Sequence, residues 1–541
     1  MIRHVMGHDL VADTLGGVLD WAVAEHPDSV FALFDDEQYT LGQLDDMARR
    51  IGAALLKSGV KSGDRLAALM YPSPWHLALA FACARHGVVW CPLNVALGID
   101  DLAYTLNDLQ PALVLLDDDL QTVLNEVRSG DARMAALPLV ICTPTARGDA
   151  PAFSDGWVGA ERAEGKCEAA ASDSLAIIYS GGTSGRPKGI EVSQFYAVSS
   201  GLRLNELARF GKRETFFTVM QFSHAWTPLT ILPWCLLYDH VFAFWRWWSA
   251  SRFVDAAIRY NASITDVYAG MAATLFLGDA AKDTRSIPAT RSIAGWGGDE
   301  EISKRIRRQF QERFGVTTLQ MYSLTEVGPL SCVEWEGEPQ KFGSSGKPRG
   351  WYDVIVADNE GMPLPVGEVG EILVRPNFPN ILAKGYVNRA PHTLHTWRDL
   401  WVHTGDLGRY DEDGYLWFVG RQGHFIKRRG ELVSVSEVES ILLGIPGIDE
   451  VAVYGVPSEM SEEEIKAVIV LKAGAQLTGQ AVVDHCAGRL AYFKVPTYVQ
   501  FVAEMPRSAT KQEIERFKLK ALPLGEPLRP SGGRRPLGYS K

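Results

Sequence analysis

The residues best suited to phosphate chemistry form a loop, Ser180-Gly-Gly-Thr-Ser-Gly-Arg-Pro-Lys188, which directly follows the run 175–179 of apolar residues and a tyrosine. Glycines let backbone N–H groups turn toward an anion, hydroxyls add donors or a metal contact, and Lys188 supplies a compact positive charge. The spacing differs from that of a Walker A loop, which needs Gly, four residues and then Gly-Lys-Ser/Thr. The stretch predicts a buried strand leading into a phosphate-binding loop, and an ordinary glycine-rich turn is the alternative.

A second candidate lies where a predicted strand over 216–220 runs into Gln221-Phe-Ser-His224-Ala-Trp226. Ligands of open α/β sheets bind beyond the carboxyl ends of the strands, so His224 and Trp226 are candidates for lining a pocket. The alternative is a core histidine beside a packing tryptophan, because buried aromatic side chains mostly belong to the core.

Two further stretches carry groups that suit a nucleotide. The segment 318–326 is predicted as a strand ending in Tyr322-Ser-Leu-Thr325-Glu326. Tyr322 is able to stack on a purine, Thr325 to bond a phosphate oxygen, and Glu326 to hold a hard cation through oxygen. Asp406 follows Thr-Gly in a predicted turn between strands, where its carboxylate suits two sugar hydroxyls, although such residues are usually only turn formers.

The elements that must position these groups alternate between helix and strand. Residues 41–56 place apolar side chains on one helix face, and the stretch 66–93 gives strand, helix and strand in turn. Such alternation predicts helices packed on a mostly parallel sheet. From about residue 367 onward the pattern is all-β.

A chain of 541 residues is too long for one hydrophobic core. We predict an α/β fold with a large N-terminal domain over 1–420, built from mixed and parallel sheets covered by helices plus a β-rich subdomain. A separately patterned stretch predicts a small, mobile α+β C-terminal domain over 421–525. Residues 526–541 are rich in Pro, Gly and Arg and are expected to be a disordered tail.

Composition narrows the class of protein. Hydrophobic residues at 46% and charged residues at 22% are typical of soluble globular proteins, and a net charge of -11 argues against a nucleic-acid partner. The seven cysteines are scattered without a C-x-x-C pair, which favours a reducing compartment without disulfides or structural zinc. The N-terminus lacks a secretory apolar core, and the apolar stretch 226–248 is interrupted by prolines and charges. A cytoplasmic monomer or homodimer with no membrane span is expected.

In their order along the chain, these stretches resemble the motifs of the adenylate-forming enzymes, which include acyl- and aryl-CoA synthetases, luciferases and the adenylation domains of peptide synthetases. The resembling set comprises 179–189, His224, Gly297-Gly298, 322–326, Thr404-Gly405-Asp406, Gly420-Arg421 and Ile426-Lys427-x-x-Gly430-Glu431. It extends over about residues 12 to 520. Residues 493–496 and 426–430 look most like the carnitine and crotonobetaine-CoA ligase type.

The resemblance implies a reaction in two halves that uses ATP, Mg²⁺ and coenzyme A. A carboxylic acid attacks the α-phosphorus of ATP with pyrophosphate leaving, and the thiol of coenzyme A then displaces AMP from the acyl adenylate. Neither half needs a nucleophile from the protein. Catalysis must therefore come from positioning and from neutralising charge on the phosphates.

The resemblance also implies roles for the nucleotide-binding motifs. Thr183 and Glu326 would bind Mg²⁺. These two residues and His224 are predicted to be catalytic. The β- and γ-phosphates would be held by Ser180, Gly181, Gly182, Thr183, Ser184 and Lys188. The adenine and α-phosphate would be contacted by Gly297, Gly298, Asp299, Tyr322 and Thr325, and the ribose by Asp406 and Arg421.

For the second half-reaction, the resemblance implies that the small domain rotates and presents the Gly430 face to the pantetheine arm. Glycine at 423 frees the backbone to adopt φ > 0, which suits a hinge. The acid pocket would be lined by His224, Trp226, Trp296 and Ser323. Its aromatic walls favour an aromatic or branched acid, or one carrying a quaternary ammonium, over acetate.

The resemblance further implies a C-terminal lysine that reaches the α-phosphate, and the register of its loop is irregular. Counting from Pro506 places Gln512 in the expected slot, whereas counting back from Phe517 favours Lys511. We predict Lys511 as the catalytic lysine, because its four-carbon stem covers a one-residue shift and Gln512 carries no charge. Lys518, spaced like a residue on the following helix, is the alternative.

Two other functions remain open at this point. The chain is alternatively an adenylating enzyme that delivers the acyl group to a carrier protein or another acceptor, although no carrier domain follows the last motif. A non-catalytic nucleotide-binding protein is the other alternative, because the lysine motif is irregular. Pyrophosphate exchange and CoA-dependent release of AMP distinguish all three.

Overall fold

The computed structural model describes most of the chain, and the chain divides into two compact units. The described residues are 4–97, 99–130, 132–142, 161–163, 165–180, 187–278, 280–296, 301–421, 425–428, 431–457, 463–487, 489–490, 494–507 and 514–531. Within them, the first unit comprises residues up to 404 together with 408–418, and the second comprises 405–407 and the residues from 419 onward.

The first unit contains a seven-stranded sheet in the order β20-β10-β9-β6-β5-β7-β8. The strands are β20 (Gly385–Tyr386), β10 (Lys188–Ser193), β9 (Ser174–Ser180), β6 (Val89–Pro92), β5 (Arg65–Leu69), β7 (Leu113–Asp117) and β8 (Leu139–Cys142). The strands from β9 to β8 run parallel, whereas β10 and β20 are antiparallel at one edge. This mostly parallel sheet confirms the α/β prediction.

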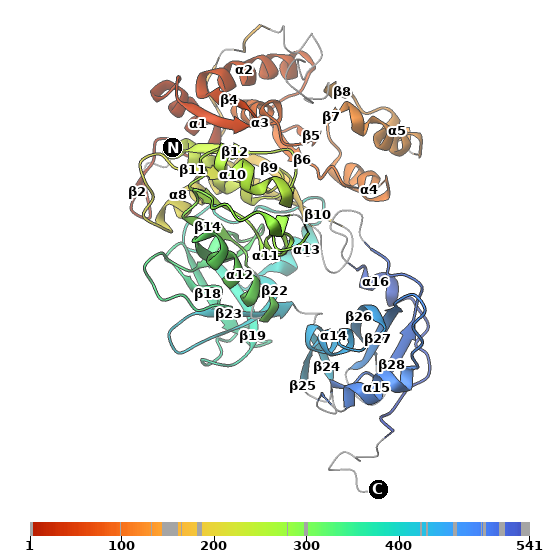
Figure 1. The fold of residues 1–541 in the computed structure, drawn as a ribbon. Coiled ribbons are helices and arrows are strands. Elements are labelled where there is room, and N and C mark those ends of the chain that lie inside the picture. Colours follow the sequence, from red (N-terminus) through yellow and green to blue (C-terminus); the bar gives the residue numbers. More distant parts are fainter. Residues whose placement is uncertain are drawn as a thin grey trace. The chain divides into compact units, whose positions relative to one another are not determined.

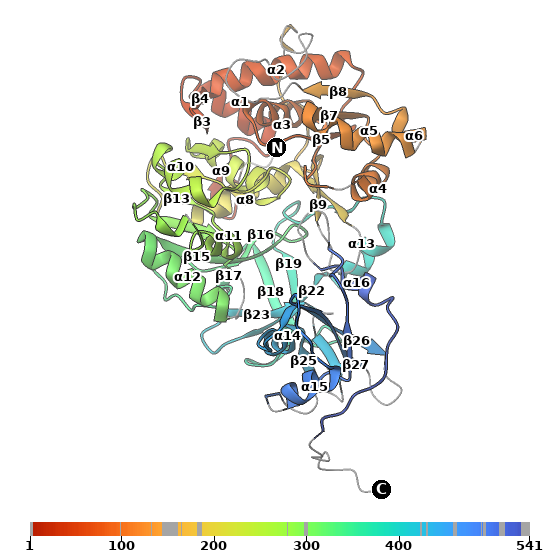
Figure 2. The ribbon, with the colours of Figure 1, turned by 45° about the vertical axis from the view of Figure 1, so that its right-hand side comes forward.

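Helices α1 (Leu15–Glu25), α2 (Leu41–Lys57) and α3 (Pro74–His86) pack on one another (Figure 1). Helix α2 begins at a capping box in which Thr40 and Gln43 satisfy each other's backbone N–H groups, as expected for a helix predicted from residue 41. Figure 2 shows α4 (Ile99–Leu109), α5 (Gln121–Gly130) and α6 (Ala132–Ala135) grouped near β7 and β8.

A nine-stranded sheet of the first unit carries most of the candidate site, in the order β17-β16-β15-β14-β13-β11-β12-β3-β4. Its six parallel strands are β15 (Thr317–Leu324), β14 (Arg291–Ala294), β13 (Ile264–Thr265), β11 (Thr215–Phe217), β12 (Val241–Phe244) and β3 (Val30–Phe34). The antiparallel edges are β17 (Lys347–Pro348), β16 (Gly328–Val333) and β4 (Glu37–Thr40).

Strand β11 is shorter than the strand predicted over 216–220. After Phe217 the Thr218 hydroxyl and the Val219 N–H donate to the Asp266 carboxylate, at 2.6 and 2.8 Å. The Asp266 carboxylate thus accepts the hydrogen bond that a neighbouring strand would otherwise accept from the Val219 N–H, and β11 ends before this residue.

The remaining helices of the first unit connect these strands. They are α8 (Gln194–Glu206), α9 (Leu232–Leu237), α10 (Phe253–Arg259), α11 (Ala269–Thr274), α12 (Glu301–Phe314) and α13 (Ala390–Thr396), with a π turn, η2, over Thr227–Ile231. Short 3₁₀ turns are η1 (Asp118–Leu120), η3 (Ala250–Arg252) and η4 (Ala280–Lys282). Among the described residues, no helix is long and apolar enough to cross a membrane.

The β-rich region expected after residue 367 is a five-stranded sheet. It contains β18 (Tyr352–Ala357), β19 (Gly370–Pro376), β21 (Trp397–Arg398), β22 (Trp401–Tyr410) and β23 (Leu416–Arg421). The prediction of a turn at Thr404-Gly405-Asp406 is wrong, because these residues lie inside β22. Gly405 has φ +70°, a conformation open to glycine, so the strand continues through a sequence typical of a turn.

The second unit has its own apolar core around Val438, Val453 and Ile469. Its elements are β24 (Phe425–Arg428), β25 (Glu431–Ser434), α14 (Val435–Leu443), β26 (Ile448–Pro457), β27 (Glu463–Leu471), α15 (Gly479–Ala487), β28 (Tyr498–Phe501) and α16 (Arg516–Leu519). Strand β27 lies between antiparallel β26 and parallel β28.

Part of the tail expected to be disordered is hydrogen-bonded in the second unit. The Leu528 N–H donates to the Thr497 carbonyl at 2.7 Å, and the Ser531 hydroxyl donates to Asp484 on α15 at 2.7 Å. The expectation of disorder therefore does not hold for residues 526–531, because polar side chains of α15 bind this segment. Residues 532–541 lie outside the described residues.

Two glycines of the first unit allow a matched test of packing. Gly346 and Gly361 have φ +77° and +79°, so an alanine at either position carries the same left-handed strain of roughly 1–2 kcal/mol. A Cβ at Gly346 would overlap the Val333 backbone carbonyl, whereas a Cβ at Gly361 meets nothing within 4 Å. Thermal unfolding should show a much larger loss of stability for Gly346→Ala than for Gly361→Ala. Equal losses would contradict the packing described here.

Candidate active site

The predicted phosphate loop joins the two strands of a β-hairpin. Strands β9 and β10 are antiparallel, and Lys188 lies directly opposite Ser180, so the two ends of the loop are held together. Both residues are half-buried. Gly181, Gly182, Thr183 and Ser184 lie outside the described residues.

Two side chains absent from the sequence-based site link Lys188 to Glu326. The Lys188 Nζ lies 2.7 Å from the His392 Nε2 and 5.4 Å from the centre of the Tyr386 ring. The Tyr386 hydroxyl donates to the Glu326 Oε1 at 2.9 Å. Tyr386 lies on β20, which pairs with β10, and His392 lies on α13.

Burial and the charge on Lys188 together favour the neutral form of His392. Burial first, and the nearby Lys188 second, lower the pKa of His392 below its usual value. Because a lysine ammonium only donates, the His392 Nε2 accepts its hydrogen bond. A neutral histidine therefore orients the lysine without cancelling its charge toward a phosphate.

A buried ion pair holds the strand that carries Tyr322 to Leu324. Arg307 of α12 and Glu334 after β16 are 2% and 1% exposed and bond each other. The Arg307 Nε also donates to the Thr318 hydroxyl at 2.6 Å, and the Glu334 carboxylate accepts the Gln320 N–H at 2.9 Å. Breaking one partner of such a pair leaves an uncompensated buried charge, so α12 and β15 are tightly connected.

Alternation along β15 sends its side chains in opposite directions. Met321 and Ser323 line a cavity, whereas the Tyr322 ring between them is buried with its centre 6.4 Å from the Phe418 ring. Thr325 follows in the turn to β16, where its carbonyl accepts the Tyr196 hydroxyl at 3.0 Å.

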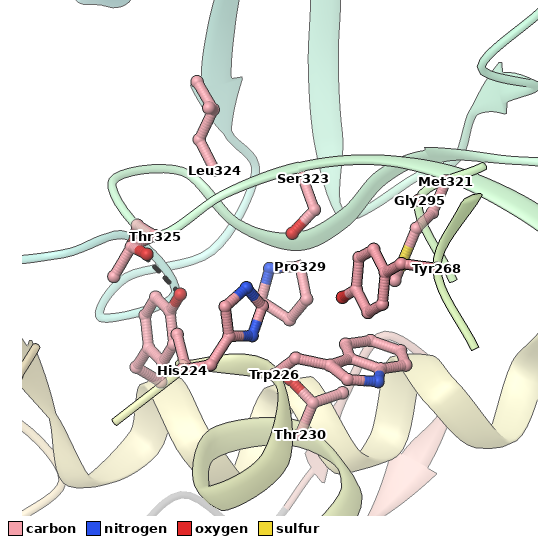
Figure 3. A pocket seen from close by; sticks show the side chains of 12 residues that line it. His224, Trp226, Thr230, Tyr268, Gly295, Met321, Ser323, Leu324, Thr325 and Pro329 are labelled. Carbon is pink, nitrogen blue, oxygen red and sulfur yellow. Dashed lines mark hydrogen bonds between the residues drawn. The ribbon is translucent and has the colours of Figure 1, made fainter. Parts of the chain in front are cut away.

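The cavity lies in the first unit and has a volume of about 150 Å³. It is lined by Tyr196, His224, Ala225, Trp226, Thr230, Tyr268, Gly295, Met321, Ser323, Leu324, Thr325 and Pro329. Figure 3 shows side chains from several elements pointing toward its centre. His224 is exposed, with its ring edge-on to Tyr268 at 5.9 Å, so it is not the core histidine of the alternative interpretation. Among the described lining residues, none is Asp, Glu, Lys or Arg.

One wall of the cavity is the π turn η2, which follows the corner containing His224. The Leu232 N–H donates to the Thr227 carbonyl, the wider i to i−5 bond of a π turn. Thr230 and, directly before the turn, Trp226 both line the cavity. Such turns are rare and are often found at functional sites.

A buried carboxyl ties together the two segments that flank the cavity. Asp266 directly follows β13 and accepts hydrogen bonds from Thr218 and Val219. Val219 lies five residues before His224 in the sequence, and Tyr268 lies two residues after Asp266. Burial raises the pKa of Asp266 to about 7, and the hydrogen bonds from Thr218 and Val219 oppose that rise. The carboxyl thus holds the corner with His224 beside the segment with Tyr268.

In the second unit, the structure brings together the two residues predicted to bind the ribose. The Arg421 Nε donates to the Asp406 Oδ1 at 2.7 Å, and the Asp406 side chain is 2% exposed. The guanidinium therefore fixes the orientation of the carboxylate.

Trp296, predicted to line the acid pocket, is not among the residues that line this cavity, although its neighbour Gly295 is. It is 2% exposed, and its ring centre lies 5.1 Å from that of Phe310 in a separate core cluster. The remaining predicted residues, Gly297, Gly298, Asp299, Gly423, Gly430 and Lys511, lie outside the described residues.

Sequence reasoning missed Tyr268, Thr230, Tyr386 and His392. Tyr268 had a usable signal, because it follows a short β-branched strand whose carboxyl end belongs to the same sheet edge as those of β11 and β15. Thr230 had none, since its orientation depends on the π turn. His392 and Tyr386 lie far along the chain from Lys188 and meet it only through the pairing of β10 with β20.

Comparisons with known proteins agree on one family. The model of the AMP-binding enzymes matches residues 19–387, and that of the AMP-binding enzyme C-terminal domain matches residues 437–512. The crotonobetaine/carnitine–CoA ligase of Proteus mirabilis is 28% identical over 488 residues, covering 88% of this chain and 92% of the relative.

Solved structures agree in fold. ATP-bound MatB from Rhodopseudomonas palustris has a TM-score of 0.77 at 25% identity, covering 94% of this chain and 98% of that one. The o-succinylbenzoate CoA synthetase of Bacillus subtilis, in complex with its acyl-adenylate intermediate, has a TM-score of 0.78 at 22% identity, covering 94% and 99%.

The raised pKa of Asp266 gives a testable dependence of stability on pH. The pKa of Asp266 is about 7 in the folded protein, and that of an aspartate in an unfolded chain is about 3.9. The protonated carboxyl therefore contributes its full stabilisation below about pH 3.9, and this contribution is lost as the pH rises through about 7. Asp266→Asn removes this titration. Between pH 5 and 8, the free energy of unfolding of the wild type should fall relative to that of the variant, by at most about 1.4 kcal/mol per pH unit.

A carboxyl with the opposite shift serves as the control. Hydrogen bonds from Arg375 and Asn377 lower the pKa of Asp353, so its contribution is lost only as the pH falls into the acid range. Asp353→Asn should follow the wild type from pH 5 to 8. Parallel stability curves for the wild type and Asp266→Asn would show that Asp266 is ionised in the folded protein.

Proposed function

This chain belongs to the family of AMP-binding enzymes, and from that premise we propose how its described residues serve the ligation of a carboxylic acid to coenzyme A. The chain is an ATP-dependent acid–CoA ligase that activates the acid as an acyl adenylate and transfers the acyl group to the thiol of coenzyme A. The observation that carries our assignment of residues is the convergence of His224, Ser323 and Thr325, far apart in the sequence, on one cavity.

We assign the acid to this cavity and the phosphates of ATP to the β9–β10 hairpin. His224 is exposed at the cavity, where its ring is able to donate to the carboxylate of the acid. Lys188, oriented by His392, places positive charge at the end of the hairpin loop for the β- and γ-phosphates. The carboxylate of Asp406, held by Arg421, would accept the ribose hydroxyls.

The residues present also fit a magnesium ion bound together with ATP. Mg²⁺ in such sites uses one or two carboxylates plus the phosphates of the substrate, rather than a cage made by the protein alone. Glu326 supplies one carboxylate, oriented by Tyr386, and the described residues contain no cluster of three or more metal-binding side chains. When bound, the ion would offset negative charge on the phosphates.

We place the protein in the cytoplasm. Six cysteines of the described part of the chain are free thiols, and five of them are buried. Such cysteines suit a reducing compartment.

Glu326 provides the first test of these assignments. Glu326→Gln keeps the shape of the side chain and removes its charge, so acid-dependent exchange of pyrophosphate into ATP should fall by on the order of a hundredfold. Glu360→Gln, in an exposed turn of the same unit, is the matched control and should retain wild-type exchange. Undiminished exchange in Glu326→Gln would remove this residue from the metal site.

The C-terminal lysine is tested by comparing two alanine variants. Lys518 lies on α16, is 55% exposed and pairs with Glu515 at 2.5 Å, as expected for a lysine on a helix surface. Lys511→Ala should lower adenylation by on the order of a hundredfold and leave thioester formation from supplied acyl adenylate largely intact. Normal adenylation in Lys511→Ala with loss in Lys518→Ala would reverse the assignment.

A further inference from the structure

The cavity described above also restricts which acid this ligase takes, an inference that rests on the proposed placement of the acid there. Its volume of about 150 Å³ equals that of the engineered protein cavity that holds benzene. A benzoyl ring or a branched chain of similar size therefore fills the space. A long acyl chain exceeds this volume.

The described walls disfavour a second charge on the acyl group. Apart from His224, no described lining residue is acidic or basic, and Trp226 and Thr230 are buried at 3% and 0% exposure. A carboxylate carried into such a space loses its hydration without gaining an ionic partner. The quaternary ammonium that the sequence left open would gain only the faces of Trp226 and Tyr268, so we rank an uncharged acyl group above it. The buried carboxyl of Asp266, two residues before Tyr268, is engaged by Thr218 and Val219, and it would repel a second carboxylate when ionised.

The polar groups of the walls call for an uncharged hydrogen-bonding substituent. The Thr230 hydroxyl is fully buried and has no hydrogen-bond partner among the described residues. Leaving such a group unsatisfied costs roughly 1–3 kcal/mol, which a ligand hydroxyl would recover. Figure 3 shows the hydroxyls of Tyr268 and Ser323 turned toward the same space. The Tyr196 hydroxyl does not compete for the ligand, because it donates to the Thr325 carbonyl.

We propose that the acid is a ring-sized monocarboxylic acid bearing one uncharged hydroxyl group, of the hydroxybenzoate type, and that Thr230 hydrogen-bonds this hydroxyl. Trp226 and Tyr268 supply the aromatic surface against which the ring packs. The carboxylate of the acid stays at the His224 side, where the exposed imidazole lies.

The test compares pairs of acids that differ only in the hydroxyl. Acid-dependent pyrophosphate exchange is measured with benzoate and the 2-, 3- and 4-hydroxybenzoates, alongside phthalate, carnitine and hexadecanoate. At least one hydroxybenzoate should exceed benzoate in kcat/KM by about tenfold or more, the value expected for one buried hydrogen bond. Phthalate, carnitine and hexadecanoate should be poor substrates.

Thr230→Val keeps the shape of the side chain and removes its hydroxyl. The ratio of kcat/KM for the preferred hydroxybenzoate over benzoate should fall to near one, whereas Thr230→Ser should retain the preference. Thr227→Val is the matched control, because Thr227 lies in the same π turn but its hydroxyl contacts Thr218 at 3.2 Å. It should leave the ratio at the wild-type value. Binding of hydroxybenzoyl and benzoyl sulfamoyl-adenosine, stable mimics of the two adenylates, should change in the same way without turnover.

Each other outcome overturns the inference. A wild-type ratio in Thr230→Val removes Thr230 as the selecting residue. Best activity with phthalate, carnitine or hexadecanoate refutes the uncharged, ring-sized class and leaves the proposed ligase function intact. Exchange with no acid of the panel refutes the hydroxybenzoate class and leaves the proposed ligase function to acids outside the panel, whereas exchange with benzoate that Glu326→Gln leaves undiminished counts against the proposed assignment of residues.

Discussion

The site depends on the parallel hydrogen-bonded ladder from β11 through β13 and β14 to β15. Parallel strands bring their carboxyl ends to one edge of the sheet, so segments that are distant in the sequence meet there. His224, Tyr268, Gly295 and Ser323 each follow or end one of these four strands. The cavity they line is therefore a consequence of sheet topology rather than of any local motif.

Buried polar contacts then set the details of that edge. Asp266 ends β11 by taking up the Val219 N–H, and the freed chain turns into the corner that carries His224 and the π turn. The ion pair of Arg307 with Glu334 holds β15 against α12. Among the described residues that line the cavity, none is Asp, Glu, Lys or Arg. The described walls thus offer an acyl group aromatic and aliphatic surface, hydroxyls and the His224 imidazole.

The part of the first unit assigned to the phosphates contains charged side chains, in contrast to the cavity. Lys188 and Glu326 have opposite charges and come from separate sheets, yet Tyr386 touches both and His392 orients the lysine. Lys188 and Glu326 are thus each oriented by a neutral side chain. Such positioning of charged groups suits catalysis by charge stabilisation.

The helices and strands with strong periodicity, such as α2 behind its Thr40 cap, could be predicted from the amino-acid sequence alone. So could the chemical types gathered around the site. Local propensity and ordered motifs suffice for these, because they depend on neighbours along the chain. Tertiary structure decided which side chains face the cavity. Trp226 lines it and Trp296 packs on Phe310, although both are tryptophans near strand ends. Thr404 to Asp406 continue a strand despite a turn-like sequence, and Thr230 faces the cavity only because the helix widens into a π turn. The orientation of these side chains and the course of β22 depend on contacts with segments that are distant in the sequence. The local sequence pattern does not predict such contacts.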